Sequence, residues 1–238
     1  MQNKAGFLIS FEGGDGVGKT TQIQILTQRL IDLGYSAQDF RELMSTELGR
    51  EVRRLTGQTT GEQISPLAEV FLFQAGRAEA VNKLYRPALA NGKIVILDRF
   101  IDSSVVFQGF ARGLGAALIE ELNQISTAQL KPNLTICLTL DPIEAASRIT
   151  KIRELDRFEA AGEELQKSVQ AGYDYIAQSE PNRFCLVDGR GTIEAVAQRI
   201  EAIVLERLND NSQIDQPNQP TNQQQIKKTL NKRASSNR

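Results

Sequence analysis

The sequence predicts an α/β protein in which helices cover both faces of a parallel β-sheet. Five short apolar segments alternate with longer segments of helical periodicity, and this alternation is typical of parallel sheets with helical connections. Four of the five segments are almost continuously apolar, as strands buried on both faces are. In such sheets ligands bind at the carboxyl ends of the strands, so functional residues are expected directly after them.

The five predicted strands lie at residues 6–12, 35–40, 93–98, 133–140 and 183–188. The second, YSAQDF, gives the weakest signal of the five. Predicted helices fill the intervals, at residues 19–33, 46–55, 66–90, 115–128, 142–152, 159–178 and 192–208. Gly34 ends the first of these helices, and Asn91 with Gly92 ends the third.

The composition changes at about Asn209. Residues 209–238 are rich in Asn, Gln, Pro and Ser and contain no aromatic residue. Such a segment cannot bury enough apolar surface to offset the entropy lost on ordering. We therefore predict one domain over residues 1–208 and a polar, disordered tail over residues 209–238.

Charge and composition narrow the classes of partner and compartment. The net charge is -1, so no global basic field suggests a nucleic-acid partner. The N-terminus does not resemble a signal peptide, and no apolar run approaches the roughly 20 residues of a membrane span. Cys137 and Cys185 lie inside apolar runs, which favours buried thiols in a reducing cytoplasm. The chain has no histidine, which excludes a histidine general base.

The segment FEGGDGVGKTTQ contains the phosphate-binding pattern G-x-x-x-x-G-K-[ST]. It follows a predicted strand and begins a predicted helix, the context that the pattern requires. Loop N–H groups and the helix N-terminus bind phosphate there. Lys19 is expected to reach the β- and γ-phosphates and the Thr20 hydroxyl to ligate Mg²⁺. The predicted nucleotide-binding residues are Gly13, Gly14, Asp15, Gly16, Val17, Gly18, Lys19 and Thr20.

A second polar pair follows the third predicted strand. Asp98 ends KIVILD, where a carboxylate can hold Mg²⁺ through water. Arg99 follows it and could clamp a second phosphate bidentately. The GTPase specificity pattern N-K-x-D is absent from the sequence, as is D-x-x-G after the third strand. The pattern therefore favours a phosphotransferase over a switch GTPase.

Five segments resemble those of thymidylate kinases and occur in the same order. They are FEGGDGVGKTTQ, FRELMSTELGREVRRL, FLFQAGRAEAV, PALANGKIVILDRFIDSSVVFQGFARGLG and RELDRFE. The similarity covers about residues 5–208. It implies a five-stranded parallel sheet of the P-loop NTPase type with a helical lid, a homodimer, Mg²⁺-ATP as phosphoryl donor and dTMP as acceptor.

The resemblance also implies roles for individual residues. Asp15 matches the acidic residue that organises the bound deoxynucleotide and the transferring phosphate. Arg99 matches the clamp on the acceptor phosphate, and Arg41 matches a second arginine for it. Phe73 matches the aromatic residue that stacks on thymine, and Arg77 the arginine that hydrogen-bonds thymine O4. Phe107 and Gln108 match the two residues that lie beside the sugar and base.

The lid is expected at about residues 147–160. The residue after Asp15 is Gly16, and family members with glycine there take a catalytic arginine from the lid. Candidates in SRITKIRELDRFE are Arg148, Lys151, Arg153 and Arg157, which could stabilise the charge of the transferring phosphoryl group. The family's usual lid spacing matches only Arg148, and Arg153 is shifted by one residue.

Two departures from the family lie in the acceptor region. The family usually has R-E-P-G-G-T after the second strand, whereas residues Arg41–Thr46 of this chain have the sequence RELMST. Leu, Met and Ser adopt a positive φ only at an energetic cost. The second departure is Gly76, which occupies the position directly before Arg77. These changes are expected to affect affinity or efficiency more than the type of reaction.

The predicted function is phosphoryl transfer from ATP to dTMP, giving dTDP and ADP, with catalysis by Lys19, Asp15, Arg99 and the lid arginines. One alternative is another nucleoside or nucleotide kinase, which would differ in the residues around the acceptor base. The other is a nucleotide-binding homologue without catalytic activity, an alternative that the altered RELMST loop supports.

Overall fold

A single parallel sheet organises the chain. The computed structural model describes residues 6–57, 64–141, 144–145, 147–148 and 162–214. The strands are β1 (Phe7–Glu12), β2 (Ala37–Arg41), β3 (Ile94–Asp98), β4 (Leu134–Thr139) and β5 (Phe184–Asp188). They pair in parallel in the order β2-β3-β1-β4-β5. The predicted five-stranded parallel sheet is confirmed.

Burial along the strands explains their sequence patterns. Every residue of β1 and β3 is buried, because both strands lie inside the sheet and are covered on both faces. β2 lies at the edge, and its residues are half-buried or exposed. An edge strand needs fewer apolar residues, which is why YSAQDF gives a weak signal.

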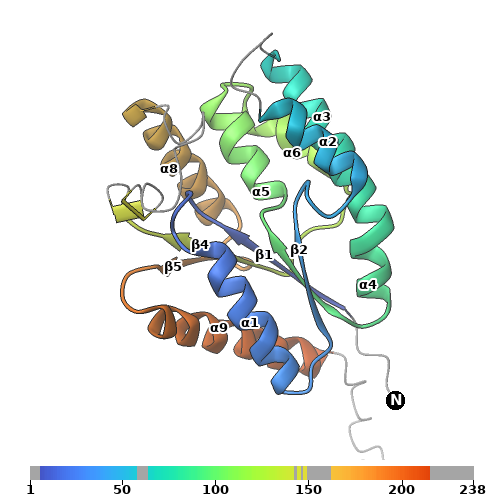
Figure 1. Cartoon of the computed structure of the whole chain (residues 1–238), viewed down its shortest axis with the longest axis vertical. Coiled ribbons are helices and arrows are strands. Elements are labelled where there is room, and N and C mark those ends of the chain that lie inside the picture. The colour runs from blue at the N-terminus through green and yellow to red at the C-terminus, as the bar shows by residue number, and fades with distance from the viewer. Residues whose placement is uncertain (1–5, 58–63, 142–143, 146, 149–161, 215–238) are drawn as a thin grey trace, which may run out of the picture. The chain divides into compact units, whose positions relative to one another are not determined.

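Helices cover both faces of the sheet. They are α1 (Lys19–Asp32), α2 (Glu47–Thr56), α3 (Pro66–Ala80), α4 (Arg86–Ala90), α5 (Ile101–Ser104), α6 (Ala116–Ser126), α8 (Gly162–Ser179) and α9 (Ile193–Ile214). α1 lies on one face, and α4, α5 and α8 lie on the other (Figure 1). This arrangement leaves the carboxyl ends of the central strands free to present polar side chains.

Two helical stretches contain π-helical turns. The predicted helix at residues 66–90 is continuous, but η1 (Val81–Tyr85) is π-helical and joins α3 to α4. The segment after β3 also folds into a helix, α5 followed by the π-helical η2 (Val105–Ala111). No helix is predicted there from the sequence. A π-turn shifts the apolar periodicity away from 3.6 residues, so the pattern gives no helical signal.

The chain divides into two compact units, residues 1–204 and 205–238. The division falls within α9, which continues to Ile214, beyond the predicted end at Leu208. No glycine or proline occurs between residues 193 and 216, so nothing in the sequence stops the helix there. Residues 215–238 lie outside the described part of the chain, and the disordered tail stays a prediction there. Across the described residues, no helix has the length and apolar character to cross a bilayer.

Candidate active site

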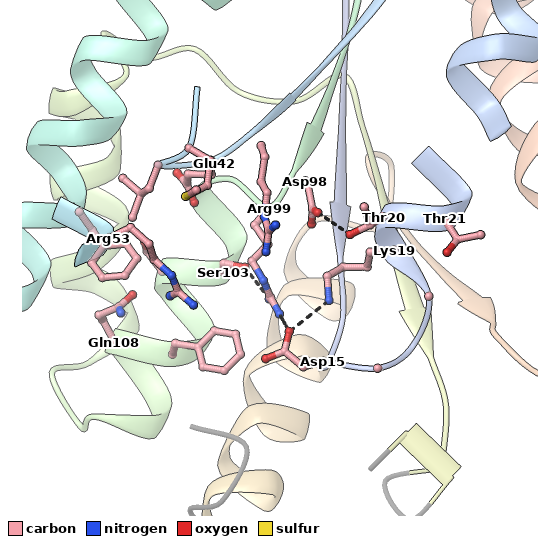
Figure 2. A pocket seen from close by; sticks show the side chains of 18 of the residues that line it. Asp15, Lys19, Thr20, Thr21, Glu42, Arg53, Asp98, Arg99, Ser103 and Gln108 are labelled. Carbon is pink, nitrogen blue, oxygen red and sulfur yellow. Dashed lines mark hydrogen bonds and ion pairs between the residues drawn. The ribbon is translucent and has the colours of Figure 1, made fainter. Parts of the chain in front are cut away.

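A cavity of about 410 Å³ lies at the carboxyl ends of β1, β2 and β3. Figure 2 shows Lys19, Thr20 and Thr21 at one end of it, Gln108 at the other, and Asp15 with Arg99 between them. The cavity thus joins the phosphate-binding loop to the segments expected to hold the acceptor nucleotide.

The phosphate-binding loop connects β1 to α1. Gly13 has φ 122°, and a Cβ added there would lie 2.3 Å from the carbonyl oxygen of Leu138. Only glycine fits this close approach to β4. The N–H of Gly13 donates to the Tyr173 hydroxyl of α8 at 3.0 Å. The loop's first turn is therefore held from two neighbouring elements.

Lys19 crosses the loop with its ammonium group buried. Its Nζ donates to the carbonyl oxygens of Gly13 at 3.1 Å and Gly14 at 2.6 Å, and lies 3.6 Å from the Asp15 carboxylate. Burial, together with the positive charge of Arg99, lowers the pKa of Lys19 to about 8. A bound polyphosphate would add negative charge beside Lys19 and favour its charged form.

Thr20 and Asp98 form the expected metal-binding corner. The Thr20 hydroxyl donates to Oδ2 of Asp98 at 2.9 Å. Hydroxyl and carboxylate oxygens are hard ligands that suit Mg²⁺, which takes its remaining ligands from water and phosphate. Among the described residues, no group of three or more His, Cys, Asp or Glu side chains is arranged to hold a metal ion.

Arg99 is fixed between the phosphate-binding loop and α5. Its Nη2 forms an ion pair with Asp15, and its Nη1 donates to the Ser103 hydroxyl at 3.1 Å. Although burial acts in the opposite direction, the Arg99 and Lys19 cations hold the pKa of Asp15 below its usual range. Arg99 has φ 71°, an uncommon backbone conformation for a non-glycine residue that points to a constrained role.

A buried carboxylate lies behind Arg99. Glu12 ends β1 and accepts from the Ser103 hydroxyl at 2.5 Å and the Phe100 N–H at 2.8 Å. Burial raises the pKa of Glu12 to about 7, and the nearby Asp102 adds to the effect. Glu12 thereby holds the start of α5, from which Ser103 reaches Arg99.

The RELMST loop contains one residue, Leu43, in the left-handed backbone region. Leu43 has φ 59° and is buried. The Ser45 hydroxyl accepts from the Arg41 N–H at 3.2 Å and donates to the Arg41 carbonyl at 2.9 Å. A Cβ added at Gly76 would lie 2.5 Å from Cδ2 of Leu43. The two departures from the family pattern therefore fit each other, since Gly76 leaves room for Leu43.

Aromatic and amide side chains also line the cavity. They include Phe73, Phe107 and Gln108, and Arg41 lines it as well. The Arg99 guanidinium lies 5.2 Å from the Phe107 ring centroid, so this ring packs beside the expected phosphate clamp.

Arg77 is not among the residues that line this cavity, and its expected contact with the base stays a prediction. The side chain is 1% exposed. Its N–H groups donate to Glu42, Gln74, Asn123, the Phe100 carbonyl and Ser104. A guanidinium has five N–H donors, and all five have partners within the protein. Arg77 therefore stands behind the cavity wall and meets it through Ser104, which lines the cavity.

Of the lid candidates, the structure describes Arg148. It lines the cavity and pairs with Glu144 at 2.7 Å. Lys151, Arg153 and Arg157 lie outside the described residues.

Several residues of the site were not predicted from the sequence. Arg53 of α2 and Ser103 and Ser104 of α5 line the cavity, and Glu12 and Tyr173 support it from behind. Arg53 lies in one of the segments that resemble thymidylate kinases, so the arginines of that segment offered a signal. Ser103 and Ser104 also lie in one of those segments, but their direction was not apparent because α5 was not predicted as a helix.

Comparison with known proteins identifies the family. The family model described as thymidylate kinase matches residues 11–200. The chain belongs to the thymidylate kinase family. It is 40% identical over 203 residues to a thymidylate kinase of Thermoanaerobacter sp. (strain X514), covering 85% of this chain and 99% of that protein.

Two further matches agree. A thymidylate kinase of Synechococcus sp. (strain JA-3-3Ab) is 42% identical over 200 residues, covering 84% of this chain and 96% of the relative. The crystal structure of thymidylate kinase from Ehrlichia chaffeensis has a TM-score of 0.69 at 29% identity, covering 84% of this chain and 98% of that one. The resemblance stated from the sequence is confirmed.

Proposed function

We propose that this enzyme transfers the γ-phosphoryl group of ATP to dTMP, giving dTDP and ADP. The observation that carries the proposal is that one cavity is lined by the Lys19 loop, by Arg99 and by the side chains Phe73, Phe107 and Gln108. A donor triphosphate and an acceptor monophosphate fit such a cavity with their reacting phosphates between Lys19 and Arg99.

ATP is bound by the loop from Gly13 to Thr20. Its N–H groups and the N-terminus of α1 hold the phosphates, and Lys19 balances the charge of the β- and γ-phosphates. Thr20 would ligate Mg²⁺, and Asp98 would hold it through water. The ion would neutralise part of the negative charge of the polyphosphate.

The acceptor phosphate lies between the arginines that line the cavity. Arg99 is its clamp, oriented by Asp15 and Ser103, and Arg41 and Arg53 add positive charge from β2 and α2. The monophosphate has a second pKa near 6 and is mostly dianionic at neutral pH. It attacks the γ-phosphorus without giving up a proton, so the reaction needs no general base.

Transfer then depends on alignment and charge. An oxygen of the dTMP phosphate forms the new bond to the γ-phosphorus as the bond to the ADP oxygen breaks. Lys19, Arg99 and Arg148 surround the charge that develops, and Arg153 is a further lid candidate. Such positioning is the main source of rate acceleration in phosphoryl transfer.

The test is purified protein with Mg²⁺-ATP and each nucleoside monophosphate in turn, with ADP and the diphosphate product measured. The expected result is fastest turnover of dTMP. Fastest turnover of a purine monophosphate, or no turnover above the blank with any acceptor, would contradict the proposal.

We also propose that the enzyme is a cytoplasmic homodimer. Apolar side chains are exposed at helical spacing on three helices in contact, Leu48 and Leu55 on α2, Leu67 and Phe71 on α3, and Leu118 and Ile125 on α6. Exposed apolar side chains that gather on packed helices suit an interaction site. Both cysteines are free, which suits a reducing compartment.

The dimer is tested by light scattering on the purified protein. Phe71→Asp places a charge on the exposed apolar face and should give monomers, whereas Lys83→Asp on the same continuous helix should not. A monomeric unmodified protein at micromolar concentration would contradict the dimer.

A further inference from the structure

Glu12 has a buried carboxylate that the proposed reaction does not use. The residue is 0% exposed, and it is not among those that line the cavity. Removing a carboxylate from water costs free energy unless hydrogen bonds and an opposite charge compensate for the loss. The partners of this carboxylate therefore indicate what it holds in place.

Hydrogen bonds run in one direction from Arg99 to Glu12. Nη1 of Arg99 donates to the Ser103 hydroxyl oxygen at 3.1 Å (Figure 2), and this hydroxyl donates to Oε2 of Glu12 at 2.5 Å. A guanidinium can only donate, and an ionised carboxylate can only accept. The Ser103 hydroxyl is oriented by both groups, so the carboxylate fixes the direction of the guanidinium through it.

The charges around Glu12 lead to the same residue. Ionisable groups that interact electrostatically with Glu12 come from several elements, and they are Arg99, Asp102, Lys19, Cys137 and Tyr173. The thiol and the phenol stay neutral, because burial raises the pKa of both. Two N–H groups of Arg183 donate to the Asp102 carboxylate at 2.8 Å. Of the two remaining cations, Arg99 is the one that hydrogen bonds join to Glu12.

Glu12 also holds the backbone beside Arg99. Its Oε1 accepts from the Phe100 N–H at 2.8 Å, and the N–H of Arg99 itself donates to the Phe11 carbonyl at 3.0 Å. Arg99 has φ 71°, and a non-glycine residue keeps such a conformation only where its surroundings enforce it. The end of β1 thus fixes both the backbone and the side chain of Arg99.

We propose that Glu12 is a positioning residue for the acceptor phosphate, which holds the Arg99 guanidinium in its clamping orientation through Ser103 and the Phe100 N–H. The clamp is then in place before the acceptor binds, so little conformational entropy is lost when the phosphate arrives. This role rests on the proposed function, in which Arg99 is the clamp, and extends it to a residue outside the cavity.

Glu12→Gln is the decisive variant, because it keeps the shape of the side chain and removes its charge. The Phe100 N–H needs the amide oxygen, so the amide nitrogen would face Ser103 and compete with Arg99 for the hydroxyl oxygen. The matched control is Ser10→Ala. The Ser10 hydroxyl donates to Oε1 of the same carboxylate at 3.1 Å, but it lies outside the path to Arg99.

The measurements are Kd for dTMP and for thymidine by calorimetry, and KM for ATP. They are made at pH 8, because burial raises the pKa of Glu12 to about 7 and the carboxylate is ionised above it. Thymidine lacks the phosphate, so its binding does not use the clamp. Glu12→Gln should raise Kd for dTMP about tenfold, the effect of one lost hydrogen bond to a charged group, and should change the other two values by less than about twofold. Ser10→Ala should keep all three values.

Equal losses for dTMP and thymidine in folded Glu12→Gln would overturn this role, because a structural defect weakens both ligands together. An unchanged Kd for dTMP would overturn it as well. If Glu12→Gln does not fold, Ser103→Ala breaks the same path and should weaken dTMP more than thymidine, and unchanged dTMP binding would refute the role.

The double variant tests whether Glu12 acts through Ser103. In the Ser103→Ala background, Glu12→Gln should raise Kd for dTMP by only about threefold or less, because the path to Arg99 is already broken. A further tenfold loss would exclude action through Ser103.

A panel of nucleoside monophosphates separates this role from the proposed function. If a different nucleotide is turned over in place of dTMP, the proposed function fails, and the same comparison of that nucleotide with its nucleoside decides the role of Glu12. If the unmodified protein binds no nucleoside monophosphate, both are overturned.

Discussion

Replacing Gly76 with alanine would place a methyl carbon 2.5 Å from Cδ2 of Leu43 and 3.5 Å from Cα of Gly49. The first distance is far below a van der Waals contact, and Leu43 has little room to move because it is buried at φ 59°. Overpacking of this kind costs about 1–3 kcal/mol. Alanine gains about 1 kcal/mol over glycine within a helix, so the net loss of unfolding free energy in Gly76→Ala is about 0–2 kcal/mol.

A double-mutant cycle with Leu43→Ala separates the two effects. Leu43→Ala removes the atom that Cβ of residue 76 would meet, and the helical gain of alanine is the same in both backgrounds and cancels. The expected coupling free energy between the two positions is about 1–3 kcal/mol. It is measured by urea unfolding of the four proteins.

The kinetic readout follows from the position of the loop. Residues 41–44 line the cavity beside Arg99, so Gly76→Ala should raise KM for dTMP more than KM for ATP, and Leu43→Ala should relieve that rise. A coupling below about 0.5 kcal/mol, together with an unchanged KM for dTMP, would refute the inferred fit between the two departures.

Three further outcomes are expected. Lys19→Ala should lower kcat by several orders of magnitude in a folded protein, measured as ADP release, because it removes the cation at the β- and γ-phosphates; near-normal turnover would contradict that role. The pKa of Glu12 is raised from 4.5 to about 7, so its protonated form favours folding. As pH rises from about 4.5 to 7, the unfolding free energy of the unmodified protein should therefore fall by up to about 3 kcal/mol relative to that of Glu12→Gln. Urea unfolding of both proteins at pH 5 and pH 8 measures this, and the same free-energy difference between them at both pH values would exclude it. Removal of residues 215–238 should leave activity and Tm almost unchanged because of their composition, and a drop of several degrees in a thermal scan would show that they stabilise the domain.

The sequence alone determined the features that arise from contiguous residues. The pattern from Gly13 to Thr20 requires a strand before it and a helix after it, so spacing was enough to predict a phosphate-binding loop. Continuous apolar runs are needed wherever a strand is covered on both faces, so β1, β3 and β4 could be recognised without coordinates. The family resemblance extended this to the sheet, the nucleotide and most cavity residues, including Phe73 and Gln108.

Tertiary structure alone decided the relations between residues far apart in the chain. Nothing local shows that Gly76 makes room for Leu43, or that Glu12 holds Ser103 against Arg99, because each pair meets only after the strands and helices pack. Arg77 is the clearest case. Its neighbours in the sequence do not show that all five of its donors have partners, which come from the β2–α2 loop, α3, α5 and α6. A buried guanidinium must satisfy its donors wherever the fold supplies acceptors, and only the packing of those elements shows where they are.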